Sequence, residues 1–271
     1  MKIYSGMCVS LSLIVLLLMC SPGYAQEHVD ISSLHPPIIG VIIPIQDESL
    51  LLQKSIMNNK VITISGIKYN VGKINNASVV FVNSGLGKIN SAVITTRLIA
   101  DFHPDLILMS GSSGNINPSL KKGDIVIGKE VINADFGTLT SSGTQFQYSE
   151  YLLNPQKNTL LPLKFNLDNK LLKIADHLPK KNLPNIYFGK IATSDALPNQ
   201  SLQIKTLQEG KFDVVEMEGA PFMQACWLFN TPCMIIRGVS NDPKESITKP
   251  DIILAADNAA KVLIAFLSHY R

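Results

Sequence analysis

The sequence predicts an α/β fold of three layers, in which a β-sheet lies between two layers of helices. Short segments rich in Ile and Val alternate along the chain with longer segments whose apolar residues recur at helical spacing. The short segments are apolar at nearly every position, which is typical of strands that are buried on both faces. At 271 residues the chain is long enough to bury a large core in a single α/β domain.

The first half of this domain begins with a strand and a helix. IIGVIIPI (38–45) is predicted to be a buried strand, and the next helix, at 47–57, begins with Asp47 and Glu48, which suit a helix N-terminus. Apolar runs and helical spacing then predict a strand at 77–84, a helix at 88–102 and a strand at 105–113.

The second half repeats this alternation after a polar interruption. Its predicted strands lie at 124–132, 185–193, 212–218 and 232–240, and its predicted helices at 219–230 and 251–270. The polar stretch at 138–165 contains Phe146, Tyr148 and Tyr151. Since a structureless segment of this length in a compact domain is often functional, we expect a lid.

The N-terminus is predicted to be a secretory signal peptide. Lys2 precedes an apolar stretch at 9–19, and Gly23-Tyr24-Ala25 offers a cleavage site of small residues. An uncleaved anchor is less favoured because the stretch is shorter than a membrane span, and a lipoprotein is less favoured because a bulky residue precedes Cys20. We therefore expect a secreted, periplasmic protein without stable membrane association after cleavage. The expected parts are a signal peptide at 1–25, an N-terminal extension at 26–37 and one domain at 38–271.

The charge, cysteine and histidine content bears on nucleic-acid binding, disulfides and metal binding. The net charge is only +3, so the sequence shows no electrostatic footprint for nucleic acid. Cys226 and Cys233 remain after signal removal; secretion would permit a disulfide, but a core of this size does not need one, and we expect two buried thiols. The histidines are scattered and no spacing is typical of a zinc site, so we expect neither a metal nor a cofactor.

Two glycine-containing motifs follow predicted strands. In SGLGK (84–88) the backbone amides could hold an anion or an oxygen-rich ligand, or the glycines could serve only a tight turn. This motif lacks the spacing of a dinucleotide fingerprint and of a P-loop. SGSSGN (110–115) lacks the spacing of a nucleophile elbow, and no histidine has the context of a general base, so a serine hydrolase is not expected.

Acidic residues at the ends of strands are the sharper signal, because ligands of such sheets bind at the carboxyl ends of the strands. Glu48 follows the first strand, and FDVVEMEGAPF (212–222) places Glu216 and Glu218 at the end of another. If 212–218 is a strand throughout, both carboxylates project to the same side. Arg237, on the last predicted strand, can partly neutralise them.

Six motifs, taken in order, resemble the purine nucleoside phosphorylase/uridine phosphorylase superfamily. They are IIGVIIPIQDES, FVNSGLGKINSA, LMSGSSGNINPSLKKGDIVIG, IATSDALPN, VVEMEGAPF and IIRGVSND. Within this superfamily they are most similar to the 5'-methylthioadenosine/S-adenosylhomocysteine nucleosidases, from about Ile38 to Phe266. The resemblance implies a nucleoside phosphorylase-like fold, with a central mixed, partly barrel-like sheet between the helix layers. It also implies a homodimer that acts on a small-molecule purine nucleoside.

The resemblance implies a role for each matching residue. Glu48 would be the general base that activates water, and Ser112 and Arg237 would help to place that water and the base. Glu218 would bind the ribose hydroxyls. The other residues that the resemblance assigns to substrate binding are Asp195 and Leu197 at the purine edge, Met217 against the sugar, Glu216 near the attacking water, and Gly114 and Ser240.

Two positions depart from the family pattern. Asn241 stands where the nucleosidases have an aspartate that protonates the purine, and asparagine can donate a hydrogen bond but cannot deliver a proton. Asn241 could favour a 6-oxopurine, Asp242 could take the acid role, or the protein could bind nucleosides and turn them over poorly. Leu197 replaces an aromatic residue that often stacks on the purine.

The expected reaction is hydrolysis of the N-glycosidic bond of a purine nucleoside. The phosphorylases of the superfamily carry an arginine in the first loop and another three residues before the serine that matches Ser112. Here PIQDES has no arginine and the second position is Met109, so water is the expected nucleophile. A phosphate-dependent phosphorylase, a 6-oxopurine nucleosidase and a non-catalytic nucleoside-binding or storage protein remain as alternatives. A solute-binding protein of a transporter is disfavoured because no repeat is visible.

Overall fold

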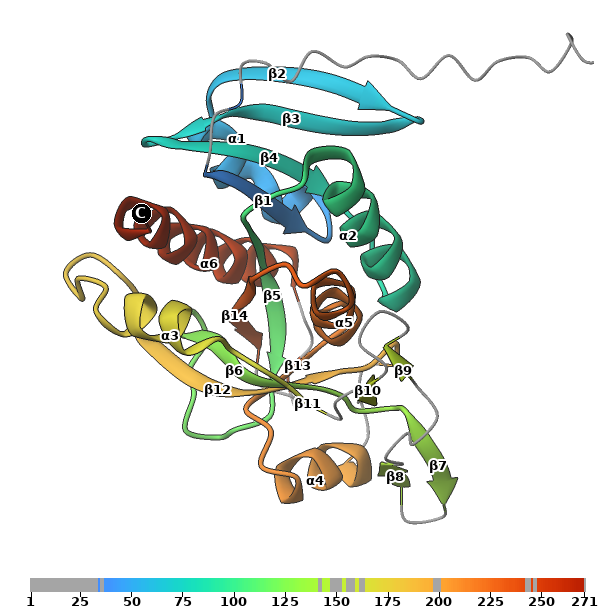
Figure 1. The fold of residues 1–271 in the computed structure, drawn as a ribbon. Coiled ribbons are helices and arrows are strands. Elements are labelled where there is room, and N and C mark those ends of the chain that lie inside the picture. The colour runs from blue at the N-terminus through green and yellow to red at the C-terminus, as the bar shows by residue number, and fades with distance from the viewer. Residues whose placement is uncertain are drawn as a thin grey trace, which may run out of the picture. The chain divides into compact units, whose positions relative to one another are not determined.

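The computed structural model describes residues 34, 37–140, 143–146, 153–154, 159–160, 164–196, 201–241, 245 and 248–270. These residues belong to one structural unit, in which a ten-stranded mixed sheet is flanked by helices (Figure 1). The predicted signal peptide and nearly all of the predicted extension at 26–37 lie outside the described residues, so both stay predictions.

The centre of the sheet is parallel, as the doubly apolar strands predict. β1 (Ile38–Ile43) lies between β4 (Ala77–Asn83) and β5 (Leu106–Asn115) and is parallel to both. Ile39, Val41 and Ile43 face one hydrophobic core, whereas Ile42 faces the other. Each face of the sheet therefore needs its own layer of helices.

Five strands of the sheet close into a ring. β5 pairs with β13 (Val214–Glu216), β13 with β12 (Ile186–Thr193), and β12 with β6 (Ile125–Asn133). β14 (Cys233–Asn241) closes the ring, because it pairs with β5 on one side and with β6 on the other. This ring confirms the mixed, partly barrel-like sheet that the resemblance implied.

The helices form two layers on opposite faces of the sheet, which confirms the three-layer prediction (Figure 1). One layer contains α2 (Lys88–Phe102) and α5 (Gly219–Phe229), and the other contains α1 (Leu50–Ser55), α3 (Asn169–Asp176) and α6 (Lys249–His269). By length and composition α6 could span a membrane. Its buried residues, such as Leu263 and Phe266, pack in the core instead, as in the central helix of a globular domain.

Several elements differ from the sequence prediction. The segment after β1 begins as a short 3-10 helix, η1 (Gln46–Ser49), and α1 ends before Met57, where β2 (Met57–Ile64) begins. β2 and β3 (Ile67–Ile74) form a hairpin that the sequence analysis missed. The exposed face of β2 weakens its hydrophobic pattern, but Ser65-Gly66, both at positive φ, is a typical hairpin turn.

The described parts of the polar stretch at 138–165 form short strands, so the expectation of a structureless segment is wrong for them, whereas the lid stays a prediction. β7 (Gly137–Thr140) pairs with β8 (Gly143–Phe146), β9 (Leu153–Asn154) pairs with β10 (Thr159–Leu160), and β11 (Lys164–Asn166) pairs with β6. Tyr148 and Tyr151 lie outside the described residues. The sequence analysis also missed α3 and α4 (Ser201–Glu209). These helices have only 8 and 9 residues, which is too short for a clear helical pattern of apolar residues.

Candidate active site

Glu48, Glu216 and Glu218 come together around Arg237. Glu48 lies in η1, shortly after β1. Arg237 lies in β14, which pairs with β5, and β5 in turn pairs with β1. Arg237 Nη2 lies 3.1 Å from Glu218 Oε2 and forms a second ion pair with Glu216. All four side chains are almost completely buried. Strand ends that are distant in the sequence thus place three carboxylates and one guanidinium together.

Ser112 on β5 holds the carboxylate of Glu48. The Ser112 amide donates to Glu48 Oε1 at 2.9 Å, and the Ser112 hydroxyl donates to the same oxygen. Among the described residues the other oxygen, Oε2, has no hydrogen-bond partner although it is buried. Glu48 is therefore fixed through one oxygen and keeps the lone pairs of the other to accept a proton.

Burial raises the pKa of two of the carboxyl groups. Desolvation raises the pKa of Glu48, while Arg237 and the hydrogen bonds from Ser112 act in the opposite direction. Desolvation also raises the pKa of Glu218 to about 7, with Arg237 lowering it and Glu216 raising it. Burial works to lower the pKa of Arg237, but the three carboxylates outweigh burial and raise it. Arg237 therefore stays charged, whereas Glu218 is near its titration midpoint at neutral pH.

Glu216 and Glu218 do not share one side of a strand, so that expectation is wrong. β13 ends at Glu216, and Glu218 is the residue that precedes the first turn of α5. The carboxylate of Glu216 accepts from the amides of Glu218 at 2.9 Å and Gly219 at 2.7 Å, and from the hydroxyl of Thr193. The helix N-terminus and Arg237 together bring the two carboxylates to the same place.

The SGLGK turn does hold an anion, and the anion comes from the protein itself. The Gly87 amide donates to Glu218 Oε1 at 2.9 Å, and the Lys88 amide donates to Asp195 Oδ1 at 2.9 Å. Gly87 has φ +89°, a conformation that other residues adopt only with strain. The N-terminus of α2 therefore positions Glu218, which the sequence analysis did not foresee.

A cavity of about 210 Å³ lies among these groups. The predicted site residues that line it are Glu48, Ser112, Gly114, Glu216, Met217, Glu218, Arg237 and Ser240. Asn241 lies beside it, because it pairs with Gly114 in the β14–β5 ladder and its Oδ1 accepts from the Ser240 hydroxyl at 2.8 Å. The cavity is polar on the side of the acids and apolar at Met217, a combination that is typical of pockets for small molecules.

One further predicted residue, Asp195, does not join the described wall of this cavity. Its amide donates to Asp135 Oδ2 at 3.0 Å, and its carboxylate accepts from the Lys88 amide at 2.9 Å. Leu197 and Asp242 lie outside the described residues. Asp135 itself was missed: it pairs with Lys88, and a carboxylate on the turn after β6 carries no signal that the sequence analysis could use.

Gly111 is a second residue that the sequence analysis missed. A Cβ at this position would lie 2.5 Å from Arg237 Nη1 and 2.8 Å from Glu48 Oε2. Only glycine lets the general-base candidate and the guanidinium approach the strand so closely. In the part of the chain that the structure describes, no cluster of His, Cys, Asp or Glu has the composition of a metal site.

The comparisons with known proteins agree with this geometry. The model of the phosphorylase superfamily matches residues 38–270. The 5'-methylthioadenosine/S-adenosylhomocysteine nucleosidase of an Exiguobacterium species is 32% identical over 84% of this chain and 96% of that protein. The nucleosidase of the same name from Haemophilus ducreyi is 31% identical over 86% of this chain and 98% of that protein.

Solved structures give the same result. The nucleosidase of Neisseria meningitidis in complex with methylthio-immucillin-A superimposes with a TM-score of 0.76 at 27% identity, over 86% of this chain and 100% of that one. The enzyme of Streptococcus pneumoniae, with a transition-state inhibitor, has a TM-score of 0.74 at 28% identity, over 86% of this chain and 99% of that one. The chain therefore belongs to the phosphorylase superfamily and, within it, to the family of the 5'-methylthioadenosine/S-adenosylhomocysteine nucleosidases.

Proposed function

We propose that the protein hydrolyses the N-glycosidic bond of purine nucleosides of the 5'-methylthioadenosine/S-adenosylhomocysteine type, releasing the free purine and a ribose derivative. One observation carries this proposal: Glu48, Glu216 and Glu218 border one cavity, and Arg237 is the only cationic side chain in its described wall. Cleavage of the bond gives the sugar oxocarbenium character. A buried site with excess negative charge stabilises such a cation as it develops.

Glu48 acts as the general base in this proposal. Ser112 holds Oε1, so Oε2 can take the proton of a water that attacks the anomeric carbon. The raised pKa makes Glu48 a stronger base than an exposed glutamate once it is ionised. Arg237, whose Nη1 lies 3.4 Å from the Ser112 carbonyl, orients this pair.

Glu218 binds the ribose hydroxyls, and Glu216 positions it. Glu218 accepts one hydrogen bond from Gly87 and one from Arg237, which leaves acceptor capacity on both oxygens for vicinal hydroxyl groups. Glu216 is surrounded by donors from Thr193, α5 and Arg237, and so serves mainly to fix the start of α5. Met217 supplies the apolar surface beneath the sugar.

Water, not phosphate, is the proposed nucleophile. Arg237 is the one cationic side chain in the described cavity wall, and both of its carboxylate partners already compete for it. Met109, which stands where a phosphorylase has a second arginine, contacts Arg237 Nη2 through its sulfur at 3.3 Å. A phosphate dianion would meet three carboxylates there and no unpaired cation among these residues.

Departure of the purine is the step at which a second candidate arises. The Asn241 Oδ1 accepts from the Ser240 hydroxyl, and its Nδ2 donates to the Glu245 carbonyl at 3.5 Å. An amide N–H that turned from this carbonyl to the purine N7 would stabilise the departing base without protonating it. This chemistry also suits a 6-oxopurine, whose oxygen is a further acceptor. Asp242 is the alternative acid. If neither group supports departure, the protein is a nucleoside-binding protein.

A substrate panel separates these possibilities. Methylthioadenosine, S-adenosylhomocysteine, adenosine, inosine and guanosine are incubated with the purified protein, with and without phosphate, and free base is measured. We expect phosphate-independent release from the 6-aminopurine nucleosides. Release only from inosine and guanosine would assign a 6-oxopurine nucleosidase, dependence on phosphate would assign a phosphorylase, and calorimetric binding without release would overturn the enzymatic proposal.

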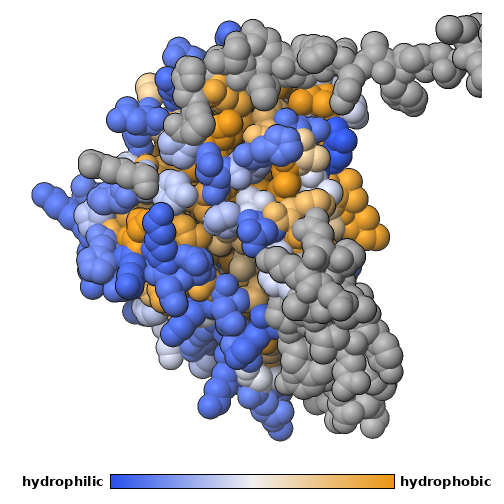
Figure 2. All heavy atoms as spheres, viewed as in Figure 1, coloured by the Kyte–Doolittle hydropathy of each residue, from blue (hydrophilic) through white to orange (hydrophobic). Residues whose placement is uncertain are grey.

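The proposed assembly is a homodimer through the exposed face of α2. Leu86, Ile89 and Val93 lie at helical spacing and are 55%, 79% and 53% exposed, and Figure 2 shows apolar side chains gathered in this region. Leu86 also lines the cavity, so a second copy on this face would narrow its mouth. Light scattering should give twice the monomer mass, and Ile89→Lys should reduce it; a monomeric unsubstituted protein would contradict the proposal.

The proposed location is the periplasm, after removal of residues 1–25. The support is the signal-like N-terminal sequence. Cell fractionation with N-terminal sequencing should find a soluble periplasmic form that begins at Gln26, and an uncleaved cytoplasmic form would contradict this proposal.

A further inference from the structure

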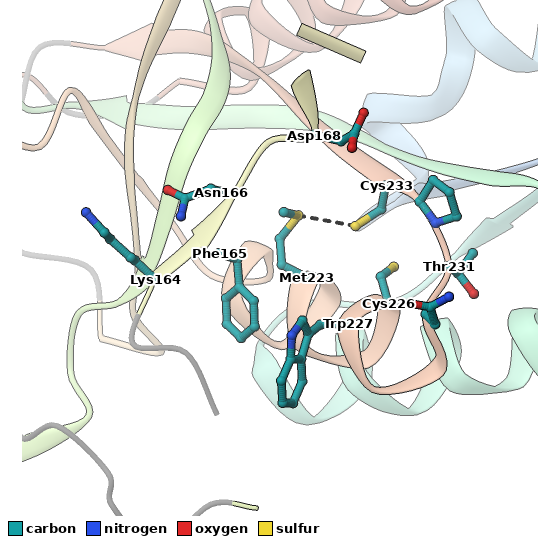
Figure 3. A pocket seen from close by; sticks show the side chains of 11 residues that line it. Lys164, Phe165, Asn166, Asp168, Met223, Cys226, Trp227, Thr231 and Cys233 are labelled. Atoms are coloured by element: carbon teal, nitrogen blue, oxygen red, sulfur yellow. Dashed lines mark hydrogen bonds between the residues drawn. The ribbon is translucent and has the colours of Figure 1, made fainter. Parts of the chain in front are cut away.

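A second cavity, of about 500 Å³, lies between α5 and the strands β11 and β14 (Figure 3). It shares no lining residue with the acid-lined cavity. Phe165 and Trp227 form part of its wall, and three sulfur-containing side chains, Met223, Cys226 and Cys233, lie beside one another there.

The local fold brings the two cysteines together. Cys226 lies near the end of α5, which stops at Asn230 in the left-handed conformation, φ 56°. The Thr231 amide then donates to the Cys226 carbonyl at 2.9 Å, which turns the chain back so that β14 starts at Cys233. This is a short and well-defined connection between two rigid elements.

The two thiols differ in accessibility. Cys226 is fully buried, and burial, with a further contribution from the neighbouring Cys233 thiol, raises the pKa of the Cys226 thiol. Cys233 is partly exposed in the wall of the cavity, and its thiol donates to the Met223 sulfur at 3.4 Å. An oxidant in solution therefore reaches Cys233 first, while Cys226 stands behind it as the resolving thiol.

We propose that Cys226 and Cys233 form a thiol pair that a small-molecule or protein disulfide oxidises to an intramolecular disulfide. The Cys233 thiolate attacks the external disulfide and expels one thiolate, which gives a mixed disulfide. Cys226 loses its proton and attacks the Cys233 sulfur, which expels the second thiolate. Two protein thiols and one external disulfide thus become one protein disulfide and two external thiols, with two electrons passing to the external disulfide.

The new bond would link elements that carry the acid-lined site. α5 begins at Glu218, and β14 carries Arg237, so a bond between the end of α5 and the start of β14 restrains both. It would also restrict the unfolded chain, since it closes a loop from Cys226 to Cys233. Oxidation is therefore a stabilising modification outside the site of the chemistry.

Peptide mapping tests the proposal on the full chain. The reduced protein is incubated with oxidised glutathione at pH 8, remaining thiols are alkylated, and the protein is digested with trypsin, which releases both cysteines in the single peptide 212–237. We expect this peptide to escape alkylation and to be lighter than its reduced form by two hydrogen atoms. Full alkylation, or glutathione that remains on Cys233, would overturn the proposal.

Thermal unfolding gives a second readout that needs no enzymatic activity. The oxidised protein should melt at least about 2 °C above the reduced protein. Cys233→Ser, at the more exposed position, should abolish this difference, and Cys226→Ala should abolish it as well. An equal difference in either variant, or no difference in the unsubstituted protein, would overturn the proposed link.

Discussion

Glu218 allows a quantitative test of the electrostatics of the site. Burial raises its pKa to about 7, from an ordinary value of 4.5. The folded protein therefore holds a proton on Glu218 more tightly than the unfolded chain does. We expect Glu218→Gln, which keeps the size of the side chain but cannot ionise, to remove the part of the stability that depends on this proton.

The size of the effect follows from proton linkage. Below pH 4.5 the carboxyl group is protonated in both states, and its neutral form gives the folded state its full stability. As the pH rises through about 7 the folded protein must ionise a buried group, and that stability is lost. The gap between the two pKa values corresponds to about 3 kcal/mol, since one pKa unit is worth about 1.4 kcal/mol.

Urea unfolding of the ligand-free protein between pH 4.5 and pH 8.5 measures this term. Other groups titrate in the same range, so the informative quantity is the free energy of unfolding of the original protein minus that of Glu218→Gln. We expect this difference to fall by about 3 kcal/mol across the range. Glu209→Gln is the matched control, because the Glu209 side chain is 68% exposed, and its difference should stay constant.

A constant difference for Glu218→Gln would refute the reasoning. It would mean that Arg237, only 3.1 Å away, stabilises the ionised carboxylate enough to cancel its desolvation. A difference that rises with pH would be a stronger contradiction, since it would place the folded-state pKa of Glu218 below that of an exposed glutamate.

Three further variants test the remaining parts of the site. Glu48→Gln should lower kcat by about 10²- to 10⁴-fold without loss of thermal stability. In the unsubstituted protein kcat/KM should fall on the acid side with a midpoint above pH 4.5, because Glu48 must be ionised and burial raises its pKa. Gly111→Ala should destabilise the protein by about 1–3 kcal/mol in urea unfolding and reduce activity, since its Cβ would contact Arg237. Asp135→Asn should reduce kcat/KM by about tenfold with little change in Tm, because Asp135 anchors Lys88 beside the amide that holds Glu218.

The parts of the fold that could be predicted from the sequence are those with strong hydrophobic patterns. β1, β4, β5 and β14 are buried on both sides along most of their length, as are the first half of β6 and the second half of β12. These segments are therefore visible in the sequence as apolar runs. The hairpin of β2 and β3 could not be found in this way, because most of β2 faces solvent. Closure of the ring depends on β14 pairing with two strands, which no local pattern specifies.

The same distinction applies to the site. The rule that ligands lie at the carboxyl ends of strands was enough to group Glu48, Glu216, Glu218 and Arg237. The contacts that position these groups were not predictable, because they depend on tertiary structure. They are the hydrogen bond from the Gly87 amide to Glu218 and the close approach of Arg237 and Glu48 to Gly111. For Asn241 the sequence was more informative than the structure. The sequence shows that Asn241 departs from its family, whereas the hydrogen bond from the Ser240 hydroxyl shows only that its Oδ1 is an acceptor.

The charge balance of the site connects its stability to its chemistry. A core that buries three carboxylates with one guanidinium is unfavourable when empty, because desolvation raises the pKa of both Glu48 and Glu218. The same imbalance becomes favourable when the sugar acquires positive charge, since the buried carboxylates then have a counter-charge at short range. Replacing Glu218 with glutamine should therefore relieve this cost at neutral pH and give a poorer catalyst, whereas Glu216 must stay ionised to balance the buried Arg237. The cluster thus trades stability for stabilisation of the transition state.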